Sequence, residues 1–407
     1  MKNLATNITL EEGIRILNDT QSTPLTETVP VTEGIHRILG EDILATMDQP
    51  PFPRSPFDGY ALQAGATKGA EKGNPVCFTV NQVIFAGDDP KLSVQSHEAA
   101  RIMTGAPIPK GADCVIMQED CKRDGDRVCV LKEMQPMQNY ISIGEDIKKD
   151  TFLLRRGSLL NYAAIGTLVS QGRNTVSVYK PPRISIISTG NEIQEPGRSL
   201  APAKIYNCNM YSIYARLKEL GHDPMMMGNF PDEEDVLKAT FAEALSLSDI
   251  VITIGGVSVG EKDYSGKIVK SLSNRTLFEG FSHKPGGSIL CTSHQGKYVF
   301  CLSGNPAAAM ISLELIVKPF LYKYATDFPM VLPKQEGILA DDFCRPRGTR
   351  RIIGGTYSVQ DSRLIIHIPE KQSPGTFSPF LDTNCLVFIP TGDGPLLAGS
   401  RVEFLSL

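Results

Sequence analysis

From residue 183 onward, short apolar runs alternate with segments whose apolar residues recur every three to four positions. Four apolar runs are typical of buried strands: residues 183–188, 224–228, 250–254 and 298–302. Four periodic segments are typical of helices: residues 209–220, 232–245, 263–272 and 306–322. Strands and helices that alternate at this spacing favour a parallel sheet with helices on both faces. The fold class predicted here is three-layer α/β.

The rest of the chain has a different pattern. Residues 60–150 show short strand-like runs separated by Gly, Pro and Asp, the clearest at 76–84 and 127–132, which predicts a β-rich insertion. After residue 327 only short strands and turns are predicted, so the last ~80 residues should form a small β domain. Outside these regions, a Thr9–Glu12 capping box, residues 32–39 and a segment capped by Asn161 predict three short helices.

Composition sets limits on partners and location. The 407 residues, 41% hydrophobic and 21% charged, predict a globular protein of about two to four domains. A net charge of −4 without a basic cluster argues against nucleic-acid binding. The nine cysteines form no CxxC pair and the six histidines are scattered, so we expect no zinc site and reduced core cysteines. With no leader pattern and no apolar segment long enough for a bilayer, we expect a cytoplasmic protein without a membrane span.

Residues 249–263, which read DIVITIGGVSVGEKD, carry the strongest local signal. A buried apolar run stops at Gly255 and Gly256, and a small polar loop with Ser258 follows. Ligands of open α/β sheets bind at the edge where parallel strands end, and glycines let an anion approach backbone amides. A plain strand-to-helix turn explains the same letters equally well.

Two similar turns follow other predicted strands. ISTGNEIQ places Thr189 and Gly190 after the run at 183–188, and FCLSGNP places Gly304 and Asn305 before a helix with Pro306 in its first turn. Free amides there suit a phosphate, although ordinary helix capping is the alternative. Three such turns at one sheet edge predict a phosphorylated ligand.

Carboxylates lie close to these turns in the sequence: Glu192, Asp232 and Asp263. Acids beside a phosphate repel it unless a cation intervenes, and Mg²⁺ bridges carboxylates to phosphates. Asp232 and Asp263 both open predicted helices, so helix capping remains an alternative for each.

Seven segments together resemble the molybdopterin molybdenumtransferase family (MoeA), which is related to the C-terminal domain of gephyrin. In chain order they are SPFDGYA, RIMTGAPIPKGAD, GEDI, STGNE, GGVSVGEKD, KPGG and SGNP. TGAPIPKGAD and GGVSVGEKD are the most specific, and the matches run from residue 52 to residue 306.

The resemblance implies four domains. They are a molybdopterin-binding α/β domain (1–26 and 180–326), a linking α+β domain for dimerisation (27–47 and 149–179), a β-rich insertion (48–148) and a C-terminal β-barrel-like domain (327–407). It further implies a homodimer whose active site joins the α/β domain to the insertion of the partner subunit. The implied reaction takes adenylylated molybdopterin (molybdopterin-AMP) and molybdate, cleaves the pyrophosphate link with Mg²⁺, releases AMP and places molybdenum on the dithiolene.

Residues at matching positions take their roles from the family. Those implied in catalysis are Asp58, Thr104, Asp146, Asp263 and Lys284, the first three contributed by the partner subunit. Those implied in molybdopterin binding are Thr189, Gly190, Glu192, Gly255, Gly256, Ser258, Gly304, Asn305 and Pro306. The implied metal ligands are Glu192, Asp232 and Asp263.

The chain departs from the family pattern at several positions. Gly280 and Gly287 stand where lysines are usual, Ser303 stands where proline is usual, and Asn191 and Asn207 replace aspartates. Two missing lysines would weaken attraction for molybdate unless an arginine, His283 or backbone amides substitute. The same departures suit a divergent paralogue with altered oxyanion preference, for example for tungstate, or a paralogue that binds without catalysing.

Three functions compete at this point. Molybdenum insertion is the leading interpretation. The preceding adenylyltransferase step uses the α/β domain alone, so the insertion and the C-terminal domain argue against it. A non-catalytic dimeric scaffold is the third, which a chain without a linker or an additional partner domain disfavours.

Overall fold

The computed structural model describes residues 5–257, 264–371 and 373–407. Two compact units are present: Met1–Glu27 with Ser177–Leu407, and Thr28–Val176. Each unit is described separately below, and the finer division into four domains stays a prediction.

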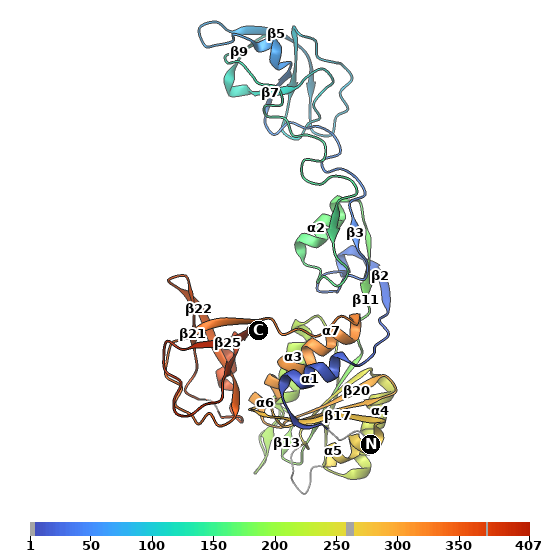
Figure 1. The fold of residues 1–407 in the computed structure, drawn as a ribbon. Coiled ribbons are helices and arrows are strands. Elements are labelled where there is room, and N and C mark those ends of the chain that lie inside the picture. The colour runs from blue at the N-terminus through green and yellow to red at the C-terminus, as the bar shows by residue number, and fades with distance from the viewer. Residues whose placement is uncertain (1–4, 258–263, 372) are drawn as a thin grey trace. The chain divides into compact units, whose positions relative to one another are not determined.

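The first unit contains a sheet of seven strands (Figure 1). In spatial order these are β1 (Thr6–Ile8), β17 (Arg275–Phe281), β19 (Ile289–His294), β20 (Lys297–Leu302), β16 (Ile250–Ile254), β12 (Ile184–Thr189) and β15 (Met225–Phe230). The four strands from β20 to β15 are parallel, whereas β19 runs antiparallel to both of its neighbours. The sheet is therefore mixed, with the predicted parallel arrangement in its central part.

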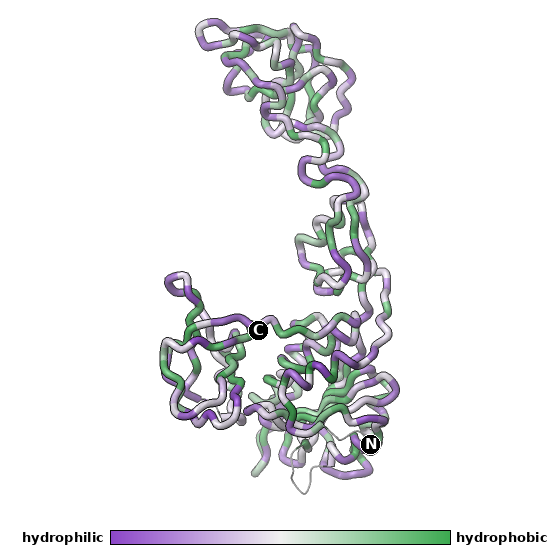
Figure 2. Tube along the Cα trace, in the orientation of Figure 1, coloured by the Kyte–Doolittle hydropathy of each residue, from purple (hydrophilic) through white to green (hydrophobic). Residues whose placement is uncertain are grey.

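Helices cover both faces of this sheet (Figure 1). One face is packed by α1 (Leu10–Asn18), α3 (Cys208–Glu219), α6 (Pro306–Ser312) and α7 (Lys318–Thr326). The other is packed by α4 (Glu234–Leu247) and α5 (Tyr264–Leu272). Figure 2 shows hydrophobic residues concentrated along the strands between them, and burying one side chain such as Phe300 contributes about 1.5–3 kcal/mol. The predicted three-layer α/β fold is confirmed.

Several predicted elements recur with small shifts. Strand β16 has the predicted bounds, and Thr9 and Glu12 form the predicted capping box at the start of α1. The helix predicted at 32–39 is wrong, because only Val31–Glu33 forms a 3₁₀ turn. Beyond it, the amides of His36 and Leu39 donate to Leu160 O and Ser158 O, which pairs this backbone with a distant segment.

The last long helix of the sheet domain is interrupted. A π-helical segment, Leu313–Val317, joins α6 to α7, so the helix predicted over 306–322 is not continuous. Within it Glu314 is 2% exposed and accepts hydrogen bonds from Arg216 Nε at 2.6 Å and Lys318 Nζ at 2.9 Å. Burial alone lowers the pKa of Arg216, but hydrogen bonds to Glu314 and Glu219 outweigh it and raise that pKa. This ionic contact ties α3 to the α6–α7 helix.

The C-terminal residues of the same unit form a small closed barrel. Its strands are β21 (Lys334–Leu339), β22 (Arg350–Gln360), β23 (Arg363–His367), β24 (Cys385–Ile389) and β25 (Arg401–Ser406). The pairing of β22 with β24 closes the ring. Strand β18 (His283–Lys284), which belongs to the sheet domain by sequence, pairs with β22 in parallel. The predicted C-terminal β domain is confirmed.

The second unit is built on a six-stranded sheet. Its strands in spatial order are β7 (Cys114–Met117), β4 (Gly59–Leu62), β6 (Glu98–Ile102), β5 (Val76–Ile84), β9 (Arg127–Val130) and β8 (Cys121–Asp124). The remaining elements are α2 (Tyr162–Ser170) and the pair β3 (Ile43–Leu44) with β10 (Phe152–Leu154). A further pair, β2 (Thr26–Pro30) with β11 (Thr175–Tyr179), contains the two points of the sequence at which one unit ends and the other begins. Short 3₁₀ turns also occur at Ala64–Thr67, Gln118–Asp120 and, in the first unit, Ser378–Leu381. The predicted β-rich insertion, including its strand at 76–84, is confirmed.

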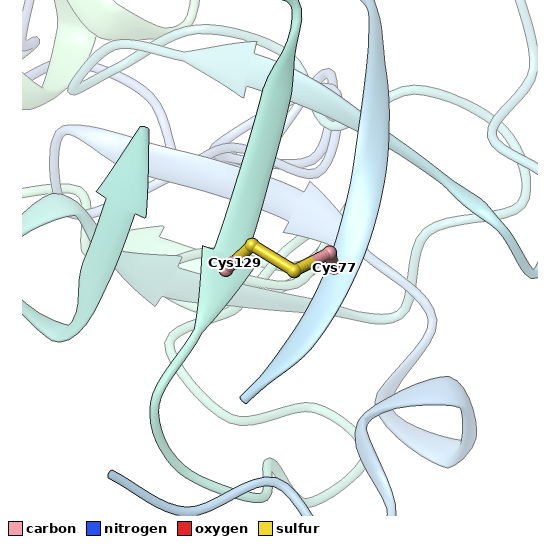
Figure 3. Close-up of a disulfide and its surroundings, with 2 residues drawn as sticks. All are labelled: Cys77 and Cys129. Atoms are coloured by element: carbon pink, nitrogen blue, oxygen red, sulfur yellow. A yellow bond between two sulfur atoms is a disulfide. The ribbon is translucent and has the colours of Figure 1, made fainter. Parts of the chain in front are cut away.

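The cysteines depart from the prediction. Cys77 on β5 and Cys129 on β9 are directly opposite in the strand register and form a disulfide (Figure 3). Cys208 and Cys344 are exposed rather than buried. The expectation that all cysteines are reduced core residues is therefore wrong. No helix of the described residues has the length and apolar character needed to cross a membrane.

Candidate functional site

Three turns come together at the carboxyl edge of the parallel strands. Ser188 of β12 pairs with Ile254 of β16, and Ile254 pairs with Leu302 of β20. Each of these three paired residues lies at the start of one of the predicted turns. The turns are therefore neighbours in space as well as similar in sequence. This arrangement confirms that the three turns share one sheet edge.

The middle turn requires glycine at two successive positions. Gly255 has φ +97° and Gly256 has φ +65°, both in the left-handed region. A Cβ at Gly255 would lie 2.6 Å from Thr189 O, and one at Gly256 would lie 2.5 Å from Ser265 Oγ. The glycines therefore let the turn pack closely against other parts of the protein, at Thr189 and Ser265. The glycines thus shape the turn whether or not an anion binds it.

A cleft of about 640 Å³ opens at these turns. The predicted residues that line it are Thr189, Gly190, Glu192, Asp232, Gly255, Gly256, Gly304, Asn305 and Pro306. The structure therefore brings together every described residue that the sequence assigns to molybdopterin or metal binding. Ser258 and Asp263 lie outside the described residues.

Helix starts supply further groups that the sequence reasoning left out of the site. Asn209 Nδ2 donates to Gly304 O at 2.7 Å and so joins the start of α3 to the third turn. Asn207 caps α3, because its side-chain oxygen accepts a hydrogen bond from Met210 N at 3.4 Å, and Asn207 also lines the cleft. Ser303 Oγ accepts from Asn305 N at 3.2 Å. The signal for these residues was their position at predicted helix starts.

Two carboxylates, Glu192 and Asp232, lie in the cleft lining. Helix α4 begins at Glu234 with Glu233 as its N-cap residue, so Asp232 is not the N-cap residue of that helix. Carboxylate oxygens are ligands that Mg²⁺ prefers, and together with substrate phosphate they suit this ion. Among the described residues, no three His, Cys, Asp or Glu side chains are grouped closely enough to hold a metal by themselves.

Lys284 lies at a second cleft of about 810 Å³, which we call the Lys284 corner; its lining also includes Phe281, His283, Gly348 and Arg350. The Lys284 side chain is exposed and makes no hydrogen bond or ion pair with a described residue. Arg350 Nη1, by contrast, donates to Glu11 Oε1 at 2.8 Å. Lys284 is therefore the cation of this corner that is available to an anion.

His283 does not replace the missing lysines. Its ring is 4% exposed and stacks on Phe281 with ring centroids 5.4 Å apart. Burial, followed by the nearby Arg350 charge, lowers the pKa of His283 to about 4. The imidazole is consequently neutral near pH 7 and adds hydrogen-bonding capacity without positive charge.

The two unusual glycines close in sequence to Lys284 have different backbone reasons: crowding at Gly287 and a positive φ at Gly280. A Cβ at Gly287 would lie 2.5 Å from His283 O and 2.7 Å from Phe281 O, and both contacts are with backbone atoms. Gly280 has φ +81°, and its Cβ would lie 3.5 Å from Gly287 O. In this chain the absence of the lysines accompanies a backbone path that excludes side chains at Gly287.

The second unit holds the remaining predicted catalytic residues. Asp58 Oδ1 accepts from Thr104 N and from Thr104 Oγ1, each at 2.8 Å. These hydrogen bonds, backbone first, lower the pKa of Asp58 and keep it ionised. Asp146 is exposed, and its side chain makes no hydrogen bond or ion pair with a described residue. The structure brings Asp58 and Thr104 together and gives no contact between either of them and Asp146.

Comparison with known proteins matches the chain in three consecutive regions. Residues 8–172 match the MoeA N-terminal region (domain I and II), residues 185–323 match a probable molybdopterin binding domain, and residues 336–407 match the MoeA C-terminal region (domain IV). Together these regions include the three turns, the Asp58–Thr104 pair and the barrel.

Full-length relatives agree. The molybdopterin molybdenumtransferase of Staphylococcus aureus (strain Mu50) is 34% identical over 402 residues, covering 98% of this chain and 95% of that protein. The Bacillus subtilis (strain 168) protein of the same name is 33% identical over 404 residues, covering 98% and 94%. The crystal structure of the molybdopterin biosynthesis MoeA protein from Pyrococcus horikoshii OT3 has a TM-score of 0.83 and 31% identity, covering 98% of this chain and all of that one. Because sequence, domain order and fold agree over nearly the whole length, the chain belongs to the molybdopterin molybdenumtransferase family, MoeA.

Proposed function

We propose that this chain inserts molybdenum into adenylylated molybdopterin and releases AMP, as one step of molybdenum cofactor biosynthesis. The observation that carries the proposal is the convergence of three backbone turns and two carboxylates on one cleft in a MoeA family member. Water adds across the pyrophosphate link, leaving one phosphate on molybdopterin and the other on AMP. Two Mo–S bonds then form, and one oxide of molybdate leaves with the two thiol protons as water.

The cleft residues hold the substrate in this proposal. The turns at Thr189, Gly190, Gly255, Gly256, Gly304 and Asn305 line the cleft where the phosphates would bind, as glycine-rich turns and helix starts do elsewhere. The amides of Gly190 and Gly255 already donate to Phe230 O and Leu302 O, so these two amides hold the turns in shape. Positioning of this kind lowers the barrier because it removes the cost of bringing the reacting groups together. Ser258 and Pro306 complete the proposed binding set.

A cation is expected beside the phosphates because Glu192 and Asp232 would otherwise repel them. These two carboxylates and Asp263 would hold Mg²⁺, which when bound offsets phosphate charge and polarises the link. The contribution of the described residues is to present two acids, Glu192 and Asp232, in the cleft lining beside the turns.

The oxyanion, molybdate or tungstate, is proposed to bind through Lys284. This lysine has no competing acidic partner among the described residues, whereas Arg350 is neutralised by Glu11 and Glu403. Gly287 by itself gives no support to the paralogue alternative, because the backbone packing around it accounts for the missing side chain.

We further propose a homodimer in which Asp58, Thr104 and Asp146 act in the partner's cleft. Support comes from the resemblance and from the ionised Asp58 carboxylate, which is held in place by two hydrogen bonds from Thr104. Location in the cytoplasm stays a prediction.

The direct test is AMP release from adenylylated molybdopterin on addition of molybdate. Wild-type protein should release AMP in proportion to molybdenum inserted, and Asp263→Asn should release far less with an unchanged melting temperature. Asn caps helices about as well as Asp, so near-normal turnover of Asp263→Asn would favour a capping role. No AMP release by the wild type would reject the proposed function.

Complementation tests the shared site. Asp58→Ala and Asp263→Ala subunits should each be inactive alone, and mixed subunits should regain activity because each heterodimer keeps one intact site. A mixture that stays inactive after verified subunit exchange would reject the shared site.

A further inference from the structure

The segment between the first turn and α3 forms a flap beside the cleft, defined here as residues 191–206. Its two ends adjoin Gly190 and Asn207, and both of those residues line the cleft. Strand β13 (Ile193–Gln194) and strand β14 (Ile205–Tyr206) pair in parallel within it. Ile205 N donates to Glu192 O at 2.9 Å, so the flap is closed at its base.

Internal hydrogen bonds give the flap a defined shape. Gln194 Nε2 donates to Ser199 O at 3.0 Å, and its Oε1 accepts from Ala201 N at 3.0 Å. Tyr206 Oη donates to Arg198 O at 2.7 Å. The Tyr206 hydroxyl is thereby satisfied inside the flap, and the position of its ring is held without any ligand.

The flap exposes apolar surface next to a polar site. Tyr206 is 42% exposed and Ile205 is 55% exposed, yet both line the cleft, as does Ile193. The turns that line the same cleft are made mainly of Ser, Thr, Gly and Asn, which suit phosphate and do not provide an aromatic surface. The cleft lining therefore offers polar turns for a phosphate and an apolar surface on the flap for a flat ring.

We propose that Tyr206 is the stacking platform for a planar heterocycle of the substrate. This inference rests on the proposed function, because adenylylated molybdopterin carries two such heterocycles, the pterin and the adenine, on either side of its phosphates. Aromatic side chains bind flat heterocycles through their faces, and the Tyr206 ring is held by its hydroxyl while still partly exposed. Tyr206 thus fixes where one ring lies when the phosphates occupy the turns.

Fluorescence can test this contact directly because the chain contains no tryptophan. Tyr206→Trp introduces a single fluorophore at the platform, to be titrated with adenylylated molybdopterin in the absence of molybdate. We expect saturable quenching. Separate titrations with AMP and with molybdopterin then identify adenine or pterin as the stacked ring.

The matched control is Tyr211→Trp. Tyr211 is 40% exposed on α3, and its hydroxyl donates to Glu195 Oε2 at 2.9 Å, but it does not line the cleft. Its tryptophan signal should stay unchanged in the same titrations. Equal quenching at both positions, or at neither, would overturn the proposal.

Kinetics provide a second readout. Tyr206→Leu should raise the KM for adenylylated molybdopterin by about tenfold, the effect of losing one stacking contact, while kcat and the melting temperature change little. Tyr206→Phe, which keeps the ring but loses the hydroxyl bond to Arg198 O that holds it, should raise the KM less than Tyr206→Leu does.

The outcomes separate this inference from the proposed function. If wild-type protein releases AMP while Tyr206→Leu keeps the wild-type KM, the platform is rejected and the function stands. If wild-type protein releases no AMP, both are rejected. If the Tyr206→Trp signal follows protein concentration instead of ligand, a second copy covers this face and the platform is rejected.

Discussion

The cleft at the sheet edge and the Lys284 corner are both built on glycines, but the glycines act differently in the two places. In the cleft, Gly255 and Gly256 adopt left-handed φ angles that form a turn. At the corner, Gly287 is outside that region, and what excludes a side chain is contact with two backbone carbonyls. One glycine pair shapes a turn that lines the cleft, whereas the other glycine lets two chain segments touch. A missing lysine is therefore better judged from the space around its Cβ than from the motif.

The largest expected effect comes from Gly287→Lys, which restores the usual family residue. Its Cβ would lie 2.5 Å from His283 O, so the backbone must move, and overpacking of this kind costs roughly 3 kcal/mol or more. We expect a markedly lower melting temperature or insoluble protein. Unchanged melting with improved molybdate use would show that the corner can accommodate the lysine and that the comparison with the cleft is mistaken.

Lowering the pH should destabilise the protein through His283 at the Lys284 corner rather than through the residues that line the cleft. Burial lowers the pKa of His283 from its ordinary value of 6.5 to about 4; the Arg350 charge also lowers it, and Glu11 acts in the opposite direction. Below pH 6.5, His283 binds a proton in the unfolded chain but stays neutral in the folded one. The free energy of unfolding therefore falls as the pH drops towards 4, by about 3 kcal/mol in all. The described residues that line the cleft include no histidine.

The measurement is thermal unfolding of wild-type protein and His283→Gln between pH 7 and pH 4.5. The variant should lose less stability over this range, because it lacks the titrating ring, while His222, also with a pKa lowered to about 4, stays in both. Parallel curves for the two proteins would contradict a buried neutral His283.

Two glycines of the cleft should separate stability from binding. Gly256→Ala places a methyl at φ +65° and against Ser265 Oγ, which should cost about 1–2 kcal/mol of stability. Gly304 has no left-handed φ, and its Cβ would meet Gly255 Cα at 3.8 Å, an ordinary contact. Gly304→Ala should therefore melt like the wild type and bind molybdopterin more weakly by calorimetry. Equal melting losses in both variants would mean that the third turn is as tightly built as the middle one.

The smallest effects concern charge at the corner. Lys284→Ala should raise the molybdate concentration for half-maximal insertion about tenfold, because a cation within hydrogen-bonding reach of an oxyanion is worth roughly 1–4 kcal/mol. Gly348→Lys adds a cation to the same lining where a Cβ meets nothing within 4 Å. It should lower that concentration by a few fold, and added salt should reduce the gain. A flat molybdate response in both variants would remove the oxyanion role from Lys284.

The sequence predicted the parts of the cleft that depend on local signals. A buried apolar run followed by glycines marks a strand and its turn regardless of distant contacts, and β16 has the predicted bounds. The capping box of α1 is equally local, since both partners lie within four residues.

Elements that depend on distant partners were missed. Strands β17 and β19 contain the polar residues Arg275, Glu279, Thr292 and His294, so neither forms a continuous apolar run. These segments are strands because β19 pairs with both β17 and β20. The disulfide joins cysteines separated by 52 residues, and their spacing carries no signal of the strand register that places them opposite each other. The tight space at Gly287 depends in the same way on where the chain turns back upon itself.

The register in which β18 pairs with β22 determines on which side of the strand the Lys284 side chain lies. His283 lies opposite Arg350 and Lys284 opposite Arg351, with His283 buried and Lys284 exposed. Because neighbouring residues of a strand point to opposite sides, a slip of one position would bury the ammonium and expose the imidazole. The barrel thus fixes the register of β18, and with it the side of the strand on which Lys284 lies. A chain shortened before residue 327 would keep its three turns but lose the strand that sets this register.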